Sequence, residues 1–175
     1  MNWKMMDDLE EESKRRGIPI IGKEKGEWLL QKVKEHQPKT ILELGTANGY
    51  SGIILGSEGG ELITIDINIK IVEEAIINYS KFSINGKIIT GDGVEVVKSL
   101  STDYFDFIFI DFYKKGYLKI LDDCFRLLKK NGVMIADNIS AEGCQDFKEA
   151  ILNNSKLKTK IIKIKDGLSY SVKID

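Results

Sequence analysis

Two short groups of polar residues have the types and the spacing to hold a metal ion. Asp111 directly follows the apolar stretch 105–110, and Asp137 and Asn138 directly follow the apolar stretch 133–136. If the two stretches are neighbouring strands, their ends lie roughly 5 Å apart, and two carboxylates and an amide oxygen come together. Without a counter-ion the two carboxylates would repel each other, and one would be protonated near neutral pH. A divalent metal removes that conflict, so the spacing predicts a metal site.

The predicted ligand set of Asp111, Asp137 and Asn138 contains only oxygen. Three protein oxygens suit Mg²⁺, which keeps open positions for water or substrate, and Mn²⁺ or Ca²⁺ accept the same ligands. The alternative is that Asp137, Asn138 or Ser140 caps the following helix, and spacing alone leaves both interpretations open.

Lys114 lies three residues after Asp111 and is the candidate general base. A nearby cation favours the neutral form of a lysine, which can then accept a proton from a hydroxyl group. The alternative is an exposed lysine in the pair formed by Lys114 and Lys115, and spacing alone favours that alternative.

Residues 40–56, TILELGTANGYSGIILG, form the second candidate site. A short apolar run contains Glu43 and ends at Gly45, and helical spacing of apolar residues begins after Gly49. Glycines at 45 and 49 let the backbone turn sharply and approach a ligand, while the helix that follows offers free N–H groups. The pattern predicts a nucleotide-like ligand, although a dinucleotide fingerprint needs a glycine where Ala47 stands. The alternative is an ordinary strand-to-helix turn.

Two further strand ends carry residues that suit a nucleoside. Asp66 follows the apolar stretch 61–65, about 20 residues after Gly45, a distance that suits a carboxylate binding ribose hydroxyls. The stretch 87–90 ends in Gly91-Asp92-Gly93, where a carboxylate and small residues could meet an adenine edge. In an open α/β sheet the ligand lies outside the carboxyl ends of the strands, so all these residues would face one site.

The elements that must position these residues alternate between strands and helices. From residue 40 onward this alternation is typical of parallel β-α-β units, and a final hairpin adds an antiparallel edge around Asp166 and Gly167. Two helices, 2–16 and 24–36, precede this core. The predicted strands are 40–44, 61–65, 87–90, 105–110, 133–136, 159–165 and 169–174, and the predicted core helices are 50–55, 69–83, 94–99, 117–129 and 142–153.

Length and composition fit one domain of a globular protein. The 175 residues are 42% hydrophobic and 30% charged, and the formal net charge of -1 gives no global attraction to nucleic acid or anionic lipid. There is no signal peptide after Met1 and no long apolar run, so we expect a cytoplasmic protein without a membrane partner. We therefore expect a single domain, 1–175, in which helices of 1–36 form a lid over a cofactor- and metal-binding core of 40–175.

The sequence resembles the cation-dependent O-methyltransferases, a group that includes catechol and caffeoyl-CoA O-methyltransferases. The resemblance covers nearly the whole chain and lies in five motifs in order. They are GKEKGEWLL at 22–30, E-x-G-x-x-x-G-Y-S at 43–51, D-x-x-K-x-x-Y at 111–117, ADN at 136–138 with Gly143 downstream, and DGL at 166–168. The family implies a doubly wound, mostly parallel seven-stranded sheet of the Rossmann-like methyltransferase fold, with an antiparallel C-terminal hairpin strand.

The resemblance also implies roles for named residues. S-adenosylmethionine would be the cofactor, Mg²⁺ or another divalent cation would be bound by Asp111, Asp137 and Asn138, and Lys114 would be the general base. Tyr113 would lie next to a small-molecule acceptor that has neighbouring oxygens. The residues expected at the cofactor are Glu43, Gly45, Thr46, Asn48, Gly49, Tyr50, Ser51, Asp66, Ile67, Asp92, Gly93 and Asp111.

Other interpretations remain open, and they make different predictions. Some relatives methylate a hydroxylated wobble uridine in tRNA, and the lysine-rich run 156–165 favours such a polyanion, whereas the net charge of -1 argues against it. A non-catalytic S-adenosylmethionine-binding protein would not need Lys114 or the metal ligands. A nicotinamide oxidoreductase is disfavoured by Ala47. The short hairpin turn carries no acid for the second hydroxyl of a catechol, and family members are often homodimers.

Overall fold

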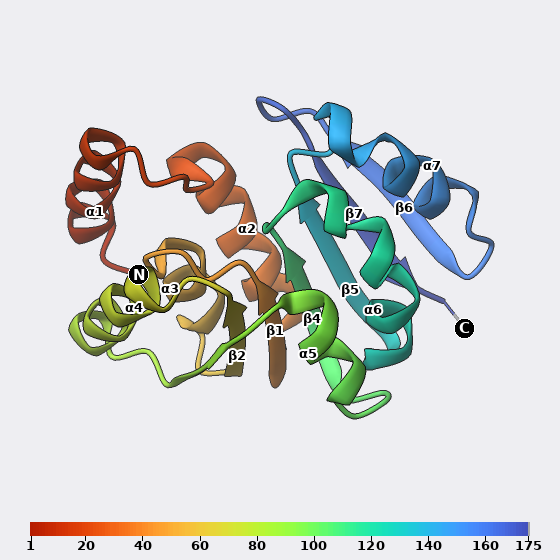
Figure 1. Ribbon diagram of the computed structural model, residues 1–175, viewed down its shortest axis with the longest axis horizontal. Helices are drawn as coiled ribbons and strands as arrows, with labels where there is room; N and C mark the ends of the chain where they lie inside the picture. The colour runs from red at the N-terminus through yellow and green to blue at the C-terminus, as the bar shows by residue number, and fades with distance from the viewer. Residues whose placement is uncertain (175) are drawn as a thin grey trace.

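A single seven-stranded sheet forms the centre of the protein (Figure 1). The computed structural model describes residues 1–174. The strands lie in the order β3-β2-β1-β4-β5-β7-β6; β1 to β5 are parallel, and β7 runs antiparallel to both β5 and β6. The expected doubly wound sheet with an antiparallel hairpin is thus confirmed. The strands are β1 (Thr40–Leu44), β2 (Glu61–Asp66), β3 (Gly86–Thr90), β4 (Phe105–Ile110), β5 (Leu128–Asp137), β6 (Leu157–Ile162) and β7 (Leu168–Lys173).

Helices cover both faces of the sheet and create two apolar cores. The central strand β4 supplies Phe107 and Phe109 to one core and Phe105, Ile108 and Ile110 to the other, as expected for a strand buried on both faces. The first core packs under α1 (Trp3–Arg16), α2 (Gly22–His36), α3 (Tyr50–Gly56) and α4 (Ile69–Phe82). The second packs under α5 (Gly93–Val96), α6 (Leu121–Leu127) and α7 (Gln145–Asn153), with short 3-10 turns at Val97–Ser99, Lys114–Gly116, Leu118–Ile120 and Glu142–Cys144.

The fifth strand is longer than the sequence predicts. We expected a helix over 117–129 and a strand over 133–136, but α6 ends at Leu127 and β5 begins at Leu128. Leu128 pairs with Phe105 and Val133 pairs with Phe107, so the residues between them form a bulge. Pairing with β4 therefore overrides the helical pattern of the last predicted turn.

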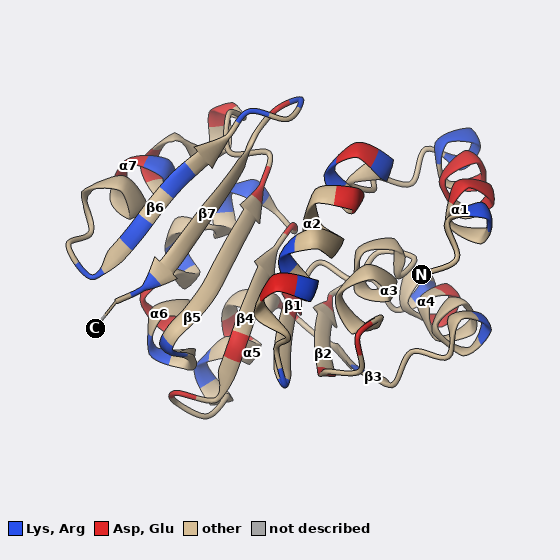
Figure 2. Cartoon of the chain, turned by 180° about the vertical axis from the view of Figure 1, so that it is seen from behind, with Lys and Arg blue, Asp and Glu red and all other residues tan. Residues whose placement is uncertain are grey.

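The turn of the C-terminal hairpin is longer than predicted. The expected strands left only residues 166–168 between them, whereas β6 ends at Ile162 and β7 begins at Leu168. Lys165 and Gly167 both have positive φ values, 50° and 83°, which bend the turn back toward β5. Asp166 is thereby directed toward the end of β5. Seen from behind, the strands β5, β7 and β6 lie in front of α6 and α7 (Figure 2).

Among the helices of residues 1–174, none has a stretch that is both long enough and apolar enough to cross a membrane.

Candidate functional site

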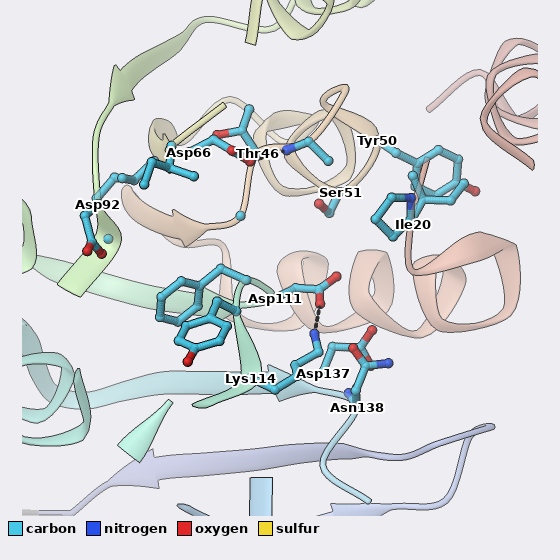
Figure 3. A pocket seen from close by; sticks show the side chains of 18 of the residues that line it. Ile20, Thr46, Tyr50, Ser51, Asp66, Asp92, Asp111, Lys114, Asp137 and Asn138 are labelled. Carbon is cyan, nitrogen blue, oxygen red and sulfur yellow. Dashed lines mark hydrogen bonds and ion pairs between the residues drawn. The ribbon is translucent and has the colours of Figure 1, made fainter. Parts of the chain in front are cut away.

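A cavity of about 660 Å³ opens at the carboxyl ends of the parallel strands (Figure 3). The chain order reverses between β1 and β4, and ligands of open α/β sheets bind at such a switch point. The volume suits a small-molecule or cofactor site. The lining residues are Pro19, Ile20, Gly45, Thr46, Ala47, Tyr50, Ser51, Ile65, Asp66, Ile67, Gly91, Asp92, Gly93, Asp111, Phe112, Tyr113, Lys114, Asp137 and Asn138.

The glycine loop after β1 lies directly against the end of β4. Gly45 has a φ of +106°, and a Cβ at this position would stand 2.1 Å from the carbonyl oxygen of Asp111. The backbone N–H of Asp111 donates to the carbonyl of Leu44 at 2.8 Å, so the two chain segments are held in this close approach. Only glycine fits here, because any side chain would separate the loop from β4.

Glu43 is completely buried behind this loop and does not line the cavity. Its carboxylate accepts hydrogen bonds from the hydroxyls of Ser51 and Thr64, both at 2.6 Å, and from Tyr79 at 3.4 Å. Burial raises the pKa of Glu43 to about 7, against the lowering effect of these hydroxyl donors, and the nearby Asp111 carboxylate raises it further. Glu43 thus fixes the loop from behind.

Asp66, at the end of β2, holds the glycine loop from the side opposite to Glu43. Asp66 accepts the backbone N–H of Ala47 through Oδ2 and that of Asn68 through Oδ1, both at 2.9 Å. Each carboxylate oxygen still has acceptor capacity toward the cavity. Asp92 accepts the N–H of Val94 at 2.9 Å and so caps α5, while Ile67 is 72% exposed at the cavity rim. Asp66, Ile67 and Asp92 line one wall of the cavity, and their contact with a cofactor stays a prediction.

Asn48 and Gly49, like Glu43, lie outside the cavity lining. The side-chain amide of Asn48 donates to Ser13 of α1 at 2.8 Å, and its oxygen is buried without a hydrogen-bond partner among residues 1–174. Tyr50 also contacts α1, because its hydroxyl donates to Glu10 at 3.1 Å. The loop therefore connects α1 to the cavity, and a direct contact between Asn48 and a ligand stays a prediction.

Asp111, Asp137 and Asn138 meet on the opposite wall, as expected for the ends of neighbouring strands, and Lys114 joins them although its spacing alone favoured an exposed lysine. Lys114 Nζ is 2.6 Å from Oδ1 of Asp111 and 3.0 Å from the hydroxyl of Tyr117, which in turn donates to the Ile110 carbonyl at 3.1 Å. Figure 3 shows Asp137 and Asn138 beside this ion pair. Parallel pairing of β4 with β5 is what brings the four side chains together.

A lysine that the sequence analysis left without a role reaches the same cluster. Lys25 of α2 has a side chain only 2% exposed, and its Nζ donates to both Asp137 and Asp166. Burial opposes the charged form of Lys25, but these two carboxylates outweigh that effect and raise its pKa. The amide nitrogen of Asn138 donates to the other oxygen of Asp166.

The donor set of Asp111, Asp137 and Asn138 fits a hard cation. Burial and the neighbouring Asp111 raise the pKa of Asp137 to about 6, and Lys25 only partly offsets this, so added positive charge would be favourable. Because the Asn138 amide nitrogen faces Asp166, its oxygen is left for another partner. No three His, Cys, Asp or Glu side chains in residues 1–174 form a cluster able to hold a metal, so a cation here would require the Asn138 amide oxygen beside the two carboxylates.

The structure also brings to the cavity residues that sequence reasoning missed. Pro19 and Ile20 come from the linker between α1 and α2 and line the cavity. Phe112 lies between Gly93 and Tyr117. Its ring stacks on the Tyr117 ring with the two ring centroids 5.6 Å apart, and a Cβ placed on Gly93 would lie 3.4 Å from Cε2 of Phe112. The apolar linker at 17–22 was visible in the sequence, but its distance from residue 45 along the chain gave no sign of this contact.

Comparison with known proteins finds one family. A family model described as O-methyltransferase matches residues 2–174. The catechol O-methyltransferase of Bos taurus is 28% identical over 148 residues, which cover 78% of this chain and 54% of the bovine protein. The catechol O-methyltransferase of Niastella koreensis is 31% identical over 137 residues, which cover 73% of this chain and 62% of that protein. The chain thus spans little more than half the length of these relatives.

Solved structures share the fold over nearly the whole chain. A Staphylococcus aureus protein provisionally named caffeoyl-CoA O-methyltransferase is 26% identical in sequence and superposes with a TM-score of 0.88. The aligned region covers 96% of this chain and 91% of that one. An O-methyltransferase from Bacillus cereus, solved in complex with SAH, is 22% identical in sequence and superposes with a TM-score of 0.85. The aligned region covers 97% of this chain and 90% of that one. The second likeness concerns the fold alone.

Proposed function

The chain belongs to the O-methyltransferase family, and we propose that it transfers a methyl group from S-adenosylmethionine to a hydroxyl group of a small molecule with neighbouring oxygens. The observation that carries this proposal is the meeting of two different walls in one cavity. One wall combines the glycine loop with Asp66, and the other combines two carboxylates, an amide and Lys114. The first suits a nucleoside cofactor, and the second suits proton removal beside a cation.

The cofactor wall offers a fitting environment for each part of S-adenosylmethionine. Gly45 lets the backbone approach the ligand, and Asp66 has acceptor capacity for ribose hydroxyls. Phe112 and the exposed Ile67 provide apolar surface for a base, next to the small Gly93. When bound, this cofactor supplies a methyl group on a positively charged sulfur, which is already an activated donor.

Asp111, Asp137 and Asn138 would hold Mg²⁺, or Mn²⁺ or Ca²⁺ in its place. When bound, such an ion supplies charge that lowers the pKa of an acceptor hydroxyl. The role of the protein's own fold is to keep these three side chains at the surface of the cavity.

Lys114 is the general base of the proposed reaction. Its Nζ is held between Asp111 and the buried Tyr117, whose position is fixed by its own bond to Ile110. In its neutral form Lys114 accepts the hydroxyl proton at Nζ, and its fixed place supplies orientation as well as basicity. Tyr113 is 60% exposed beside it, which leaves room for an acceptor larger than a simple catechol.

Replacing Lys114 tests the base directly. We expect Lys114→Met to lower the turnover of 3,4-dihydroxybenzoate by ~10³-fold, because general-base catalysis typically contributes 10²- to 10⁴-fold. Release of S-adenosylhomocysteine measures the reaction, and the matched control is Lys115→Met at the exposed neighbouring lysine. Near-normal turnover by Lys114→Met at neutral pH would contradict the assignment.

A calorimetric experiment separates cofactor from metal. We expect wild type to bind both S-adenosylhomocysteine and Mn²⁺, and Asp137→Ala to bind only the former. A wild type that binds the cofactor but no metal would refute metal-assisted catalysis and favour a metal-free transferase or a binding protein. A wild type that binds neither would refute the whole proposal.

RNA is the second candidate acceptor, because exposed lysines follow one another along β6 and into the hairpin turn at the cavity end of the sheet. Lys158 and Lys160 of β6 and Lys163 and Lys165 of the turn are all exposed. Lys165 Nζ would lie 3.3 Å from a Cβ placed on Gly22 at the start of α2, so the turn lies next to that helix. RNA binding that weakens steeply with added salt would favour this acceptor; a salt-insensitive reaction would favour a small molecule. A homodimer stays a prediction.

A further inference from the structure

Lys25 is an unusual residue to find where it lies. It stands in the first turn of α2, where the helix dipole disfavours a positive charge, and its side chain is only 2% exposed. A buried lysine is retained only where partners compensate for lost hydration. Both of its carboxylate partners, Asp137 and Asp166, come from the far end of the chain. Nothing in the proposed reaction uses Lys25 itself.

The contacts of Lys25 close a ring that includes two of the proposed metal ligands. Lys25 donates to Oδ1 of Asp137 and Oδ1 of Asp166, and the amide of Asn138 donates to Oδ2 of Asp166. The backbone N–H of Asn138 closes the ring by donating to Oδ1 of Asp137 at 2.7 Å. Each member therefore has its orientation fixed by two others.

The ring leaves one oxygen of each ligand for the cavity. Oδ1 of Asp137 is taken by Lys25 and by the Asn138 backbone, and the Asn138 nitrogen is taken by Asp166. Oδ2 of Asp137 and Oδ1 of Asn138 are what remain, and both residues line the cavity while Asp166 does not. Such outer contacts orient the ligands of metal sites.

We propose that Lys25 and Asp166 are positioning residues that hold Asp137 and Asn138 in the orientation that binds the divalent cation. This inference rests on the proposed function. Lys25 and its two carboxylates together carry one net negative charge, so the ring still attracts a cation. Two features let α2 come close enough: it begins at Gly22, whose φ is +72°, and a Cβ on Gly26 would stand only 2.9 Å from Ile54.

The test measures Mn²⁺ affinity by calorimetry, with S-adenosylhomocysteine affinity as a second readout on the same samples. We expect Lys25→Met to weaken Mn²⁺ binding on the order of 10-fold or more and to leave the S-adenosylhomocysteine affinity within about twofold, because outer contacts of metal ligands typically contribute 10- to 100-fold. The matched control is Lys23→Met, two residues earlier on the same helix, where the lysine is partly exposed and pairs with Asp7.

Asp166→Asn provides a second variant that keeps the test decisive if Lys25→Met does not fold. The Asp166 side chain is 50% exposed, so we expect the substitution to leave the fold intact, yet it removes an acceptor from either Lys25 or Asn138. We expect a several-fold loss of Mn²⁺ affinity. The double variant should lose no more than Lys25→Met alone, because the two residues act as one unit.

Three results have distinct meanings. Mn²⁺ binding that is lost in Asp137→Ala but unchanged or tighter in folded Lys25→Met and Asp166→Asn overturns the positioning role and leaves the proposed function intact. Mn²⁺ binding that weakens in both variants supports the role. A wild type that does not bind Mn²⁺ overturns the positioning role together with the metal-assisted part of the proposed function.

Discussion

The two walls of the cavity are held together by different forces. On and behind the cofactor wall, neutral donors pair with the acids: hydroxyls donate to the buried Glu43, and the backbone N–H groups of Ala47 and Asn68 donate to Asp66. On the acidic wall, charged lysines pair with the acids, Lys114 with Asp111 and Lys25 with Asp137. A neutral donor contributes a modest net free energy, whereas removing one partner of a buried ion pair leaves an uncompensated charge.

Because different interactions hold the two walls, we expect substitutions on each wall to have different effects. The cofactor wall is a fixed backbone shape with several interchangeable supports, so we expect the loss of one hydrogen bond to have a small effect. The acidic wall is a balance of charges, so we expect the loss of one lysine to disturb its neighbours. Glu43, behind the cofactor wall, is the exception, because it is a completely buried carboxylate that no positive charge compensates.

Gly45→Ala is expected to have the largest effect, because it acts on both walls. Its Cβ would stand 2.1 Å from the Asp111 carbonyl oxygen, and the φ of +106° is itself strained for alanine. We expect the affinity for S-adenosylhomocysteine to fall on the order of 100-fold or more, with Mn²⁺ binding also weakened as Asp111 moves. Calorimetric titration of each ligand measures this. Loss of cofactor binding with unchanged Mn²⁺ affinity would mean that the walls are independent.

Glu43→Gln is expected to change how stability depends on pH. The folded protein holds the Glu43 proton more tightly than the unfolded chain, because the pKa is raised from 4.5 to about 7. The resulting stabilisation is complete below pH 4.5, declines as the pH rises, and is absent above about pH 7. In wild type this amounts to a loss of up to about 3 kcal/mol in the free energy of unfolding.

The Glu43→Gln variant has no proton to lose at this position, so its free energy of unfolding should decline less over the same pH range. Urea unfolding at several pH values measures the difference between the two proteins. Glu95→Gln is the control, because that carboxylate is exposed on α5. Parallel pH curves for wild type and Glu43→Gln would show that folding does not raise the pKa of Glu43.

Tyr50→Phe is expected to have the smallest effect. The Tyr50 hydroxyl donates to Glu10 of α1 at 3.1 Å, and Glu10 keeps Lys14 at 2.6 Å as a second partner. We expect the free energy of unfolding to fall by about 1 kcal/mol, and the S-adenosylhomocysteine affinity to change less than about threefold. Urea unfolding and calorimetry measure the two quantities. A large loss of cofactor affinity would mean that α1 controls the cofactor wall more strongly than its hydrogen bonds suggest.

Much of the fold could be predicted from the sequence, because its signals are local. The five parallel strands and the hairpin were placed from apolar runs and turn residues, and six of the seven lie within a few residues of the prediction. The fifth strand was placed too short, because its first residues are defined by pairing with Phe105 rather than by their own pattern. The hairpin turn was placed too short for a related reason: its length depends on how Asp166 reaches the end of β5.

The sequence by itself indicated the polar residues at the strand ends that line the two walls, and the tertiary structure decided which other residues join them and how they are supported. Gly45, Asp66 and Asp111 stand at the ends of predicted strands, so the strand ends were enough to place them, whereas the spacing of Lys114 alone favoured an exposed lysine. Lys25 bonds to partners 112 and 141 positions away, and no local pattern encodes such a contact. Lys25 and its two carboxylate partners are so far apart in the sequence that they meet only when α2, β5 and the hairpin turn have packed together.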